Sequence, residues 1–273
     1  MIDAHQHFWQ PGRHDCTWPP PELTRIHRDY LPSDLRPLMT GAGVSGTVLV
    51  QSQPSDRDTD YLCALAAETD WVRAVVGWAD LASPAAPGRI AELAGREKLR
   101  GLRPMLQDLP DDAIADPAFE PAIAALVAHG LSFDALVRPR HLPSLHLFAA
   151  VHPQLNIVID HAAKPDIARE VLDPWRQHMR ALAALPNVYC KLSGLVTEAN
   201  ADWHRTDLAP YVTHLLSCFG PRRMMWGSDW PVLELASNYS TWMKTAQLLT
   251  RELSRDEATA LFEHTATDFY RLR

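Results

Sequence analysis

Three histidines and one aspartate stand where apolar runs of the chain end. His5 and His7 close the first run (IDAHQH), His161 closes NIVIDH, and Asp229 closes MMWGSD. Residues two apart on a strand share one face, with Cα atoms about 7 Å apart, so His5 and His7 can act together. Imidazoles can donate or accept hydrogen bonds at a reacting group, and a carboxylate can take a proton from water. The same residue types also bind zinc.

The runs that carry these residues belong to a set of eight that look like buried strands. Val, Ile and Leu dominate most of them, and several lack the polar alternation of a half-exposed strand. The runs lie near residues 2–7, 46–52, 73–80, 99–106, 131–137, 155–161, 188–193 and 223–229. Apolar residues at helical spacing occupy 59–69, 117–129, 171–185 and 255–270.

Strand and helix therefore alternate, which predicts an α/β fold, a (β/α)8 TIM barrel. A doubly wound open sheet is the alternative, but no GxGxxG follows the first run. Barrel enzymes carry their chemistry at the C-terminal ends of the strands, and strands one and eight are neighbours. Each histidine alone would more often be structural. The joint position of His5, His7, His161 and Asp229 favours a functional site.

Composition narrows the class of protein. Hydrophobic residues make up 47% and charged residues 22%, which argues against disorder. The formal net charge of −7 shows no block of one sign, so no nucleic-acid partner is expected. There is no run of 18 apolar residues, no signal-peptide pattern at the start and no CxxC pair. We expect a cytoplasmic enzyme with free thiols and no membrane partner.

The length of 273 residues fits one barrel domain over residues 1–273. The proline-rich stretch at 10–32 (with WPPPEL) is expected to form a loop over the barrel mouth.

Three motifs resemble the amidohydrolase superfamily: IDAHQHFW at the start, DHAAKP at 160–165 and GSDWP at 227–231. They look most like its sugar-lactone hydrolases, the L-fuconolactonase-like and L-rhamnonolactonase-like enzymes, and more distantly like the pyrone-dicarboxylate lactonases. VVGWADL, LRGLRPMLQD and CKLSGLVTEA also look like that branch, so the resemblance covers nearly the whole chain. It implies a barrel of amidohydrolase type. It also implies hydrolysis of an aldonolactone, such as L-fucono- or L-rhamnono-lactone, to the open-chain aldonic acid.

The resemblance also implies roles for the four residues. His5 and His7 match the first-strand pair, His161 the later histidine and Asp229 the final-strand acid. Members with a binuclear metal centre carry a Lys or Glu on the fourth strand, where this chain offers Arg103. A binuclear centre is therefore not expected. The four residues could hold one adventitious or structural zinc, but we expect catalysis that requires no cofactor.

For a lactone, Asp229 is the candidate base that activates water, while His5, His7 and His161 are candidate donors to the carbonyl. Lys164, three residues after His161, is a further candidate, at the same oxygen or at the product carboxylate. Sugar rings favour aromatic faces and amides, although each Trp would more often be a packing residue. The candidate substrate-binding residues are Arg103, Gln51, Trp9, Trp78, Trp230 and His27, and Trp18 is a candidate lid residue.

Two other functions stay open alongside the lactonase. One is a zinc-dependent decarboxylase on an amidohydrolase-type barrel, and the other is a non-catalytic sugar-binding barrel. The expected partner is a small-molecule sugar lactone, whose sugar and ring size the sequence does not specify. The oligomeric state and the roles of Lys191 and Ser193 stay open as well.

Strand parity predicts where the sixth strand points its side chains. His161 shares its parity with Ile157 and Ile159, so all three are expected to face the barrel interior. Asp160 is then expected to point outward, toward the helices.

Overall fold

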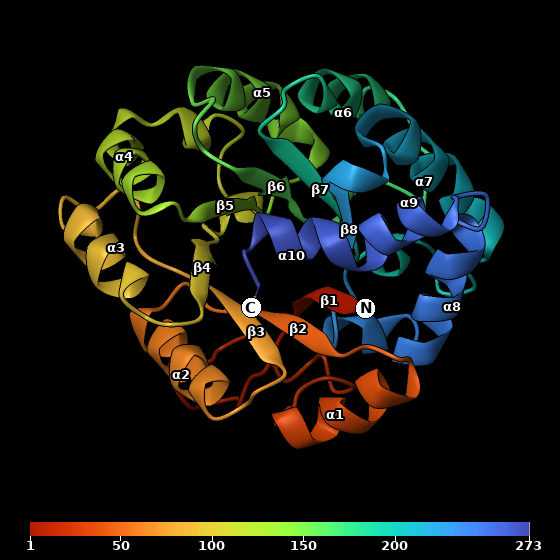
Figure 1. Ribbon diagram of the computed structural model, residues 1–273, viewed down its shortest axis with the longest axis horizontal. Coiled ribbons are helices and arrows are strands. Elements are labelled where there is room, and N and C mark those ends of the chain that lie inside the picture. The colour runs from red at the N-terminus through yellow and green to blue at the C-terminus, as the bar shows by residue number, and fades with distance from the viewer. Residues whose placement is uncertain (273) are drawn as a thin grey trace.

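The computed structural model describes residues 1–272, and these form a (β/α)8 barrel as predicted. Eight parallel strands neighbour one another in chain order (Figure 1). They are β1 Ile2–Gln6, β2 Gly46–Val50, β3 Val72–Gly77, β4 Leu99–Leu102, β5 Ser132–Ala135, β6 Ile157–Ile159, β7 Val188–Leu192 and β8 Met224–Trp226.

Backbone hydrogen bonds join the C-terminal end of β1 and the residue after it to the loop that follows β8. Asp229 N donates to His5 O (2.8 Å), and His7 N donates to Trp230 O (2.8 Å). The barrel therefore closes at the level of the predicted site, and this closure brings His5, His7 and Asp229 together.

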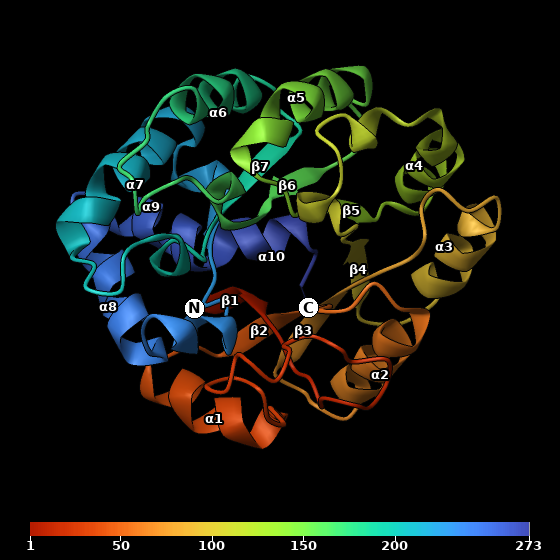
Figure 2. The same cartoon turned by 180° about the vertical axis from the view of Figure 1, so that it is seen from behind.

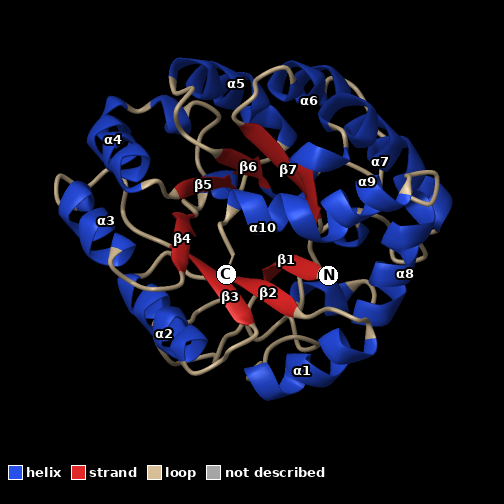
Figure 3. Cartoon of the chain, viewed as in Figure 1, coloured by secondary structure: helices blue, strands red, loops and turns tan. Residues whose placement is uncertain are grey.

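A ring of helices surrounds the strands (Figure 3). The ring and the C-terminal segment comprise α1 Pro32–Gly41, α2 Asp56–Ala67, α3 Ala86–Ala94, α4 Glu120–His129, α5 Leu142–Val151, α6 Trp175–Ala183, α7 Arg205–Phe219, α8 Tyr239–Leu249, α9 Arg255–Thr259 and α10 Thr265–Phe269. Gly130 ends α4 in the left-handed conformation (φ 63°), which glycine adopts without steric cost. No helix within residues 1–272 is long and apolar enough to cross a membrane.

Two apolar layers explain why most strands are hydrophobic on both faces. Val48, Ala74 and Val158 belong to a cluster inside the barrel, whereas Ile157 and Ile159 belong to the larger core between strands and helices. The predicted parity of β6 is therefore wrong, because its two isoleucines face the helices and its valine faces the interior.

The C-terminal segment covers one end of the barrel (Figure 1). A π-helical turn at Ala260–His264 joins α9 to α10, and Phe269 and Tyr270 then pack into the inner cluster beside Ile2, the first residue of β1. Because Ile2 begins its strand, the covered end is the one where the strands start.

The long connection between β1 and α1 lies on the opposite face of the molecule (Figure 2). Gln53, which follows β2, fastens this connection. Its side-chain oxygen accepts from Thr17 N (3.1 Å) and Trp18 N (3.2 Å), and its amide nitrogen donates to Trp18 O (2.7 Å). Thr17 and Trp18 are thereby held beside the C-terminal ends of the strands.

Candidate active site

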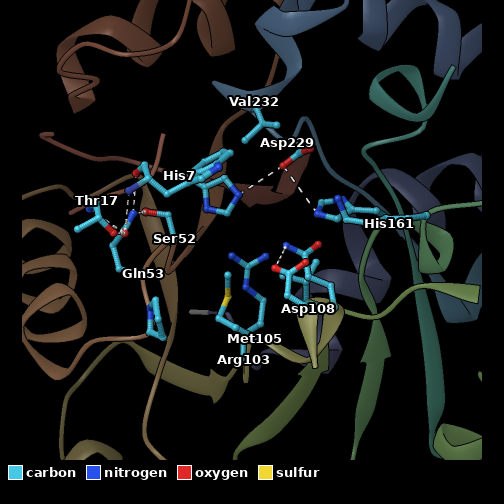
Figure 4. A pocket seen from close by; sticks show the side chains of 15 residues that line it. His7, Thr17, Ser52, Gln53, Arg103, Met105, Asp108, His161, Asp229 and Val232 are labelled. Atoms are coloured by element: carbon cyan, nitrogen blue, oxygen red, sulfur yellow. Dashed lines mark hydrogen bonds and ion pairs between the residues drawn. The ribbon is translucent and has the colours of Figure 1, made fainter. Parts of the chain in front are cut away.

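A cavity of about 360 Å³ lies at the C-terminal ends of the strands (Figure 4). Five of the predicted catalytic and charged residues line it: His7, Arg103, His161, Lys164 and Asp229. The sixth predicted catalytic or charged residue, His5, is fully buried and lies behind this lining.

The carboxylate of Asp229 lies among three imidazoles. Its Oδ1 is 3.4 Å from His7 Nε2 and 3.8 Å from the Nε2 atoms of His5 and His161. The Nε2 atoms of His5 and His7 are 3.1 Å apart. All four groups direct a nitrogen or an oxygen at one small volume, so a single water, carbonyl oxygen or cation would contact several of them.

The second nitrogen of each lining imidazole has its own partner. His7 Nδ1 lies 2.8 Å from Val50 O, and His161 Nδ1 lies 2.9 Å from Ser193 Oγ. A carbonyl oxygen only accepts hydrogen bonds, so His7 donates from Nδ1 and its Nε2 accepts when the ring is neutral. These partners fix how both rings face the cavity.

The three rings and the carboxylate favour opposite protonation states. Burial lowers the pKa of His5 and His161 well below the ordinary value and lowers that of His7 as well. Burial alone would raise the pKa of Asp229, but the neighbouring rings of His161 and His7 outweigh burial and hold it below the ordinary value. Near pH 7 the site therefore combines neutral imidazoles with an ionised carboxylate.

An unusual turn brings His161 into the site. Four consecutive residues after β6, His161 to Lys164, have left-handed backbone angles (φ 52°, 51°, 62° and 52°). Such angles are costly for residues other than glycine and cluster at functional sites. Trp175 Nε1 donates to Ala162 O (2.7 Å) and supports the turn. The turn explains why His161 and Asp160 both face inward, although they are adjacent.

Asp160 lies beneath the imidazoles in a buried network. It contacts Lys191 Nζ (3.0 Å), His5 Nδ1 (3.4 Å) and Arg103 Nη1 (3.3 Å). Lys191 Nζ also lies 2.6 Å from Asp134 Oδ2. The prediction that Asp160 points toward the helices is therefore wrong, and two carboxylates and two cationic side chains form a charged layer below the site.

Two positively charged side chains reach the cavity itself. Arg103 follows β4, and its guanidinium donates to Gln51 O and contacts Asp160. Lys164 Nζ lies 3.3 Å from Glu198 Oε1 and is partly exposed. The cavity can therefore receive an anion or stabilise a developing oxyanion.

Three residues predicted to bind substrate do not line this cavity. Gln51 is fully buried, and its amide donates to Arg103 O (2.8 Å). Trp78 is half-buried on the loop after β3. His27 bonds through Nδ1 to a carbonyl oxygen of its own loop (2.8 Å). Both Gln51 and Trp78 follow strand ends, but the side chain of Gln51 turns toward Arg103 O and Trp78 does not line the cavity.

Trp9 and Trp230, also predicted to bind substrate, do not line this cavity and lie in the hydrophobic core. They are 0% and 1% exposed, and their indole N–H groups donate to Arg28 O (3.1 Å) and Glu234 Oε1 (2.9 Å). Both rings pack edge-on against Tyr30, with centroids 5.5 and 5.0 Å away. They hold the β1–α1 connection against the loop after β8.

The rest of the lining was not predicted, apart from the lid candidate Trp18. These residues follow strand ends by one to six positions or come from the β1–α1 connection. They are Thr17, Trp18, Ser52, Gln53, Pro54, Met105, Gln107, Asp108, Leu136 and Val232. A search of the first few residues after each strand would have found most of them.

The site also has the donors for one metal ion. His5, His161 and Asp229 each offer one ligand atom, and these atoms lie within 4.8 Å of one another. His7 Nε2 is 3.4 Å from the carboxylate. Imidazole nitrogen and carboxylate oxygen are ligands that zinc prefers, so this donor set fits a single zinc.

Comparison with known proteins agrees with the geometry. A family model described as amidohydrolase matches residues 2–272. The L-fucono-1,5-lactonase of Burkholderia ambifaria is 52% identical over 99% of this chain and 95% of its own length. That of Burkholderia multivorans is 42% identical over 99% of this chain and 96% of its own.

A solved structure extends the comparison to three dimensions. The crystal structure of an amidohydrolase from Burkholderia multivorans with bound zinc superimposes with a TM-score of 0.94 at 40% identity. The match covers 100% of this chain and 99% of that one. A protein with this barrel therefore does bind zinc in a crystal.

Proposed function

Because this chain belongs to the amidohydrolase family, we propose that its cavity hydrolyses a sugar-acid lactone of the L-fucono-1,5-lactone type to the open-chain aldonic acid. Identities of 52% and 42% over nearly the full chain to two L-fucono-1,5-lactonases support the substrate class. The observation that carries the proposal is the carboxylate of Asp229, 3.4 to 3.8 Å from three imidazoles, on the wall of a cavity with room for a monosaccharide ring.

Asp229 is the general base of the proposed reaction. Its carboxylate takes a proton from a water molecule while that water's oxygen bonds to the lactone carbonyl carbon. The ring C–O bond then breaks, and the leaving alkoxide takes the proton back from Asp229. The products are a carboxylic acid, which ionises, and a free hydroxyl, so atoms and protons balance.

The developing negative charge on the carbonyl oxygen requires donors. His161 Nε2, 3.8 Å from Asp229 Oδ1, is close enough to serve the same substrate carbonyl when its Nε2 carries the proton. Lys164 lines the same cavity and brings a positive charge. A preorganised donor at an oxyanion is worth about 3 to 4 kcal/mol in the transition state.

A bound zinc would be held by His5, His161 and Asp229, with His7 beside them, and it would polarise the lactone carbonyl. We propose that hydrolysis does not require it. Arg103 and Lys164 already place two positive charges at the cavity, and a lactone is a more reactive target than an amide.

A lactone panel tests the proposal. We expect acid release, followed with a pH indicator, from six-carbon aldonolactones, with the highest kcat/KM for L-fucono-lactone. Activity should persist after exhaustive dialysis against a chelator. Loss of activity on chelation with recovery after one equivalent of zinc would contradict the metal-independent reaction. Failure with every lactone, together with CO₂ release from an aromatic acid, would instead support the decarboxylase.

A further inference from the structure

Lys191 on β7 is a fully buried ammonium that the proposed reaction does not use. Its Nζ lies 2.6 Å from Asp134 Oδ2, 3.0 Å from Asp160 Oδ1 and 3.2 Å from His5 Nδ1. An ammonium has three donors and no acceptor. Lys191 hydrogen-bonds to Asp134 Oδ2 and to His5 Nδ1, whereas its contact with Asp160 Oδ1 is an ion pair without a hydrogen bond. The contact with His5 links the buried charged layer to the imidazoles above it.

This contact determines which nitrogen of His5 carries the proton. Because Lys191 only donates, Nδ1 of His5 must accept, and the neutral ring then carries its proton on Nε2. His5 Nε2 lies 3.1 Å from His7 Nε2, which accepts because His7 donates from Nδ1 to Val50 O (2.8 Å). The result is a one-way donor chain from Lys191 through His5 and His7 to the backbone.

The other tautomer of His5 would change the site. A proton on Nδ1 would face the Lys191 ammonium at 3.2 Å and could reach only Asp160 Oδ1, at 3.4 Å. The Nε2 atoms of His5 and His7 would then present two lone pairs 3.1 Å apart, an arrangement that a cation between them stabilises. The two tautomers therefore correspond to a metal-free donor chain and to a cation site.

We propose that Lys191 is a positioning residue that holds His5 in the Nε2–H tautomer and so biases the site against metal binding. His7 Nε2 then accepts a hydrogen bond from His5. His161 is the imidazole left to face the substrate carbonyl. The inference rests on the proposed function only for this last consequence.

The direct test reads the tautomer in the wild-type protein. Histidine labelled with ¹⁵N, in chelator-treated protein at neutral pH, should give a pyridine-type Nδ1 and a pyrrole-type Nε2 for His5. The His5 signals are assigned by their loss in a His5→Asn variant. A pyrrole-type Nδ1 for His5 would overturn the proposal.

A second test measures zinc affinity by competition with a chromophoric chelator. Lys191→Met combined with Asp134→Asn removes one buried charge of each sign. Asp134 is changed as well because, without Lys191, its carboxylate would be buried without a cation. Partners of metal ligands commonly change affinity 10- to 100-fold, so zinc should bind at least about tenfold more tightly. The wild type is the reference with the same net charge. Asp134→Asn alone removes only a negative charge, so it should bind zinc no more tightly than the wild type does.

Equal zinc affinities in the double variant and the wild type would overturn the proposal. If the double variant does not fold, the ¹⁵N measurement on the wild type decides. Neither measurement uses turnover, so a failed lactone panel leaves the tautomer result intact, and a wrong tautomer leaves the lactonase proposal standing.

Discussion

Asp229 differs from the other two carboxylates in the barrel interior. Asp134 and Asp160 both contact the Lys191 ammonium, at 2.6 and 3.0 Å, whereas the neighbours of Asp229 are imidazoles at 3.4 Å or more. Asp134 and Asp160 are fully buried and do not line the cavity, so neither can reach a bound substrate. Asp229 therefore combines an ionised state with access to the cavity, and this combination is what a general base requires.

We expect Asp229→Asn to remove the base and leave the fold intact. The amide has the same shape but cannot take a proton, so kcat should fall by 10² to 10⁴, roughly 3 to 5 kcal/mol. Steady-state kinetics and a melting curve measure both effects. Asp202→Asn, at an exposed position, is the control. A folded Asp229→Asn protein with near wild-type kcat would remove Asp229 from the mechanism.

At the scale of elements, the sequence predicts the strands better than the direction of their side chains. Apolar composition locates all eight strands, because buried parallel strands are rich in Val, Ile and Leu. Parity then fails on β6 because both faces are apolar, and because counting back from His161 assumes an extended backbone. The left-handed run at 161–164 breaks that assumption, and no residue type in HAAK indicates it.

The same limit applies to the substrate-binding residues. Sequence position places Gln51 and Trp230 near the mouth, but which way a side chain leaves a strand end depends on the loop that follows. Gln51 turns toward Arg103 O, and Trp230 packs on Tyr30. Arg103 and Lys164, by contrast, carry charges that are costly to bury without a partner, and both do reach the cavity.

Gly194, after β7, is a position where a single methyl group should disturb the site. Its φ is +65°, and a Cβ there would lie 2.5 Å from His161 Nδ1. Gly194→Ala should displace the His161 ring from Ser193 and lower kcat by about 10- to 100-fold. The left-handed backbone should also cost about 1 to 2 kcal/mol of unfolding free energy.

Kinetics and urea unfolding check both effects of Gly194→Ala. The matched control is Gly88→Ala in α3, where a Cβ would contact nothing within 4 Å. It should keep full activity. An active Gly194→Ala enzyme would show that the position of His161 does not limit the reaction.

The start of α2 carries a buried acid that should make stability depend on pH. Burial raises the pKa of Asp58 to about 7 from its ordinary value of 3.8. The folded protein therefore keeps a proton up to about pH 7 that the unfolded chain releases near pH 4. This contribution to stability is fully present below pH 4 and is lost as the pH rises through 7.

Between pH 5.5 and 8 the loss from Asp58 should amount to about 2 kcal/mol of unfolding free energy. Asp58→Asn keeps an acceptor for Ser52 N and removes the titration, so its stability should depend less on pH over that range. Urea unfolding of both proteins at the two pH values measures the difference. Identical pH dependence would mean that Asp58 is ionised at pH 5.5.

At the scale of the whole molecule, the C-terminal helix supports the site from below. Tyr270 OH donates to Asp134 Oδ2 (2.6 Å), and Asp134 in turn contacts Lys191. A hydrogen-bonded path therefore runs from the last helix, through the buried charged layer, to His5. Tyr270, just after α10, and Ile2, at the start of β1, thus belong to the same inner cluster of the barrel.

Tyr270→Phe should cut this path and reduce stability. Removing a buried donor from a carboxylate costs about 1 to 3 kcal/mol, which urea unfolding resolves. Tyr189→Phe is the matched control, because its half-buried hydroxyl has no hydrogen bond to residues 1–272. Equal unfolding free energies for Tyr270→Phe and the wild type would show that the hydrogen bond from Tyr270 to Asp134 does not stabilise the fold.

Because α10 covers the end of the barrel where the strands start, substrate and product must use the other end. The cavity opens at the C-terminal strand ends, on the side opposite α10 and beside Trp18 of the β1–α1 connection. The lactone enters and the acid leaves through this same opening. The acid leaves as an anion, and the cavity that it leaves is lined by Lys164, whose ammonium lies 3.3 Å from Glu198 Oε1. The product must therefore leave the cavity before the next lactone can bind, so accumulated product should act as a competitive inhibitor.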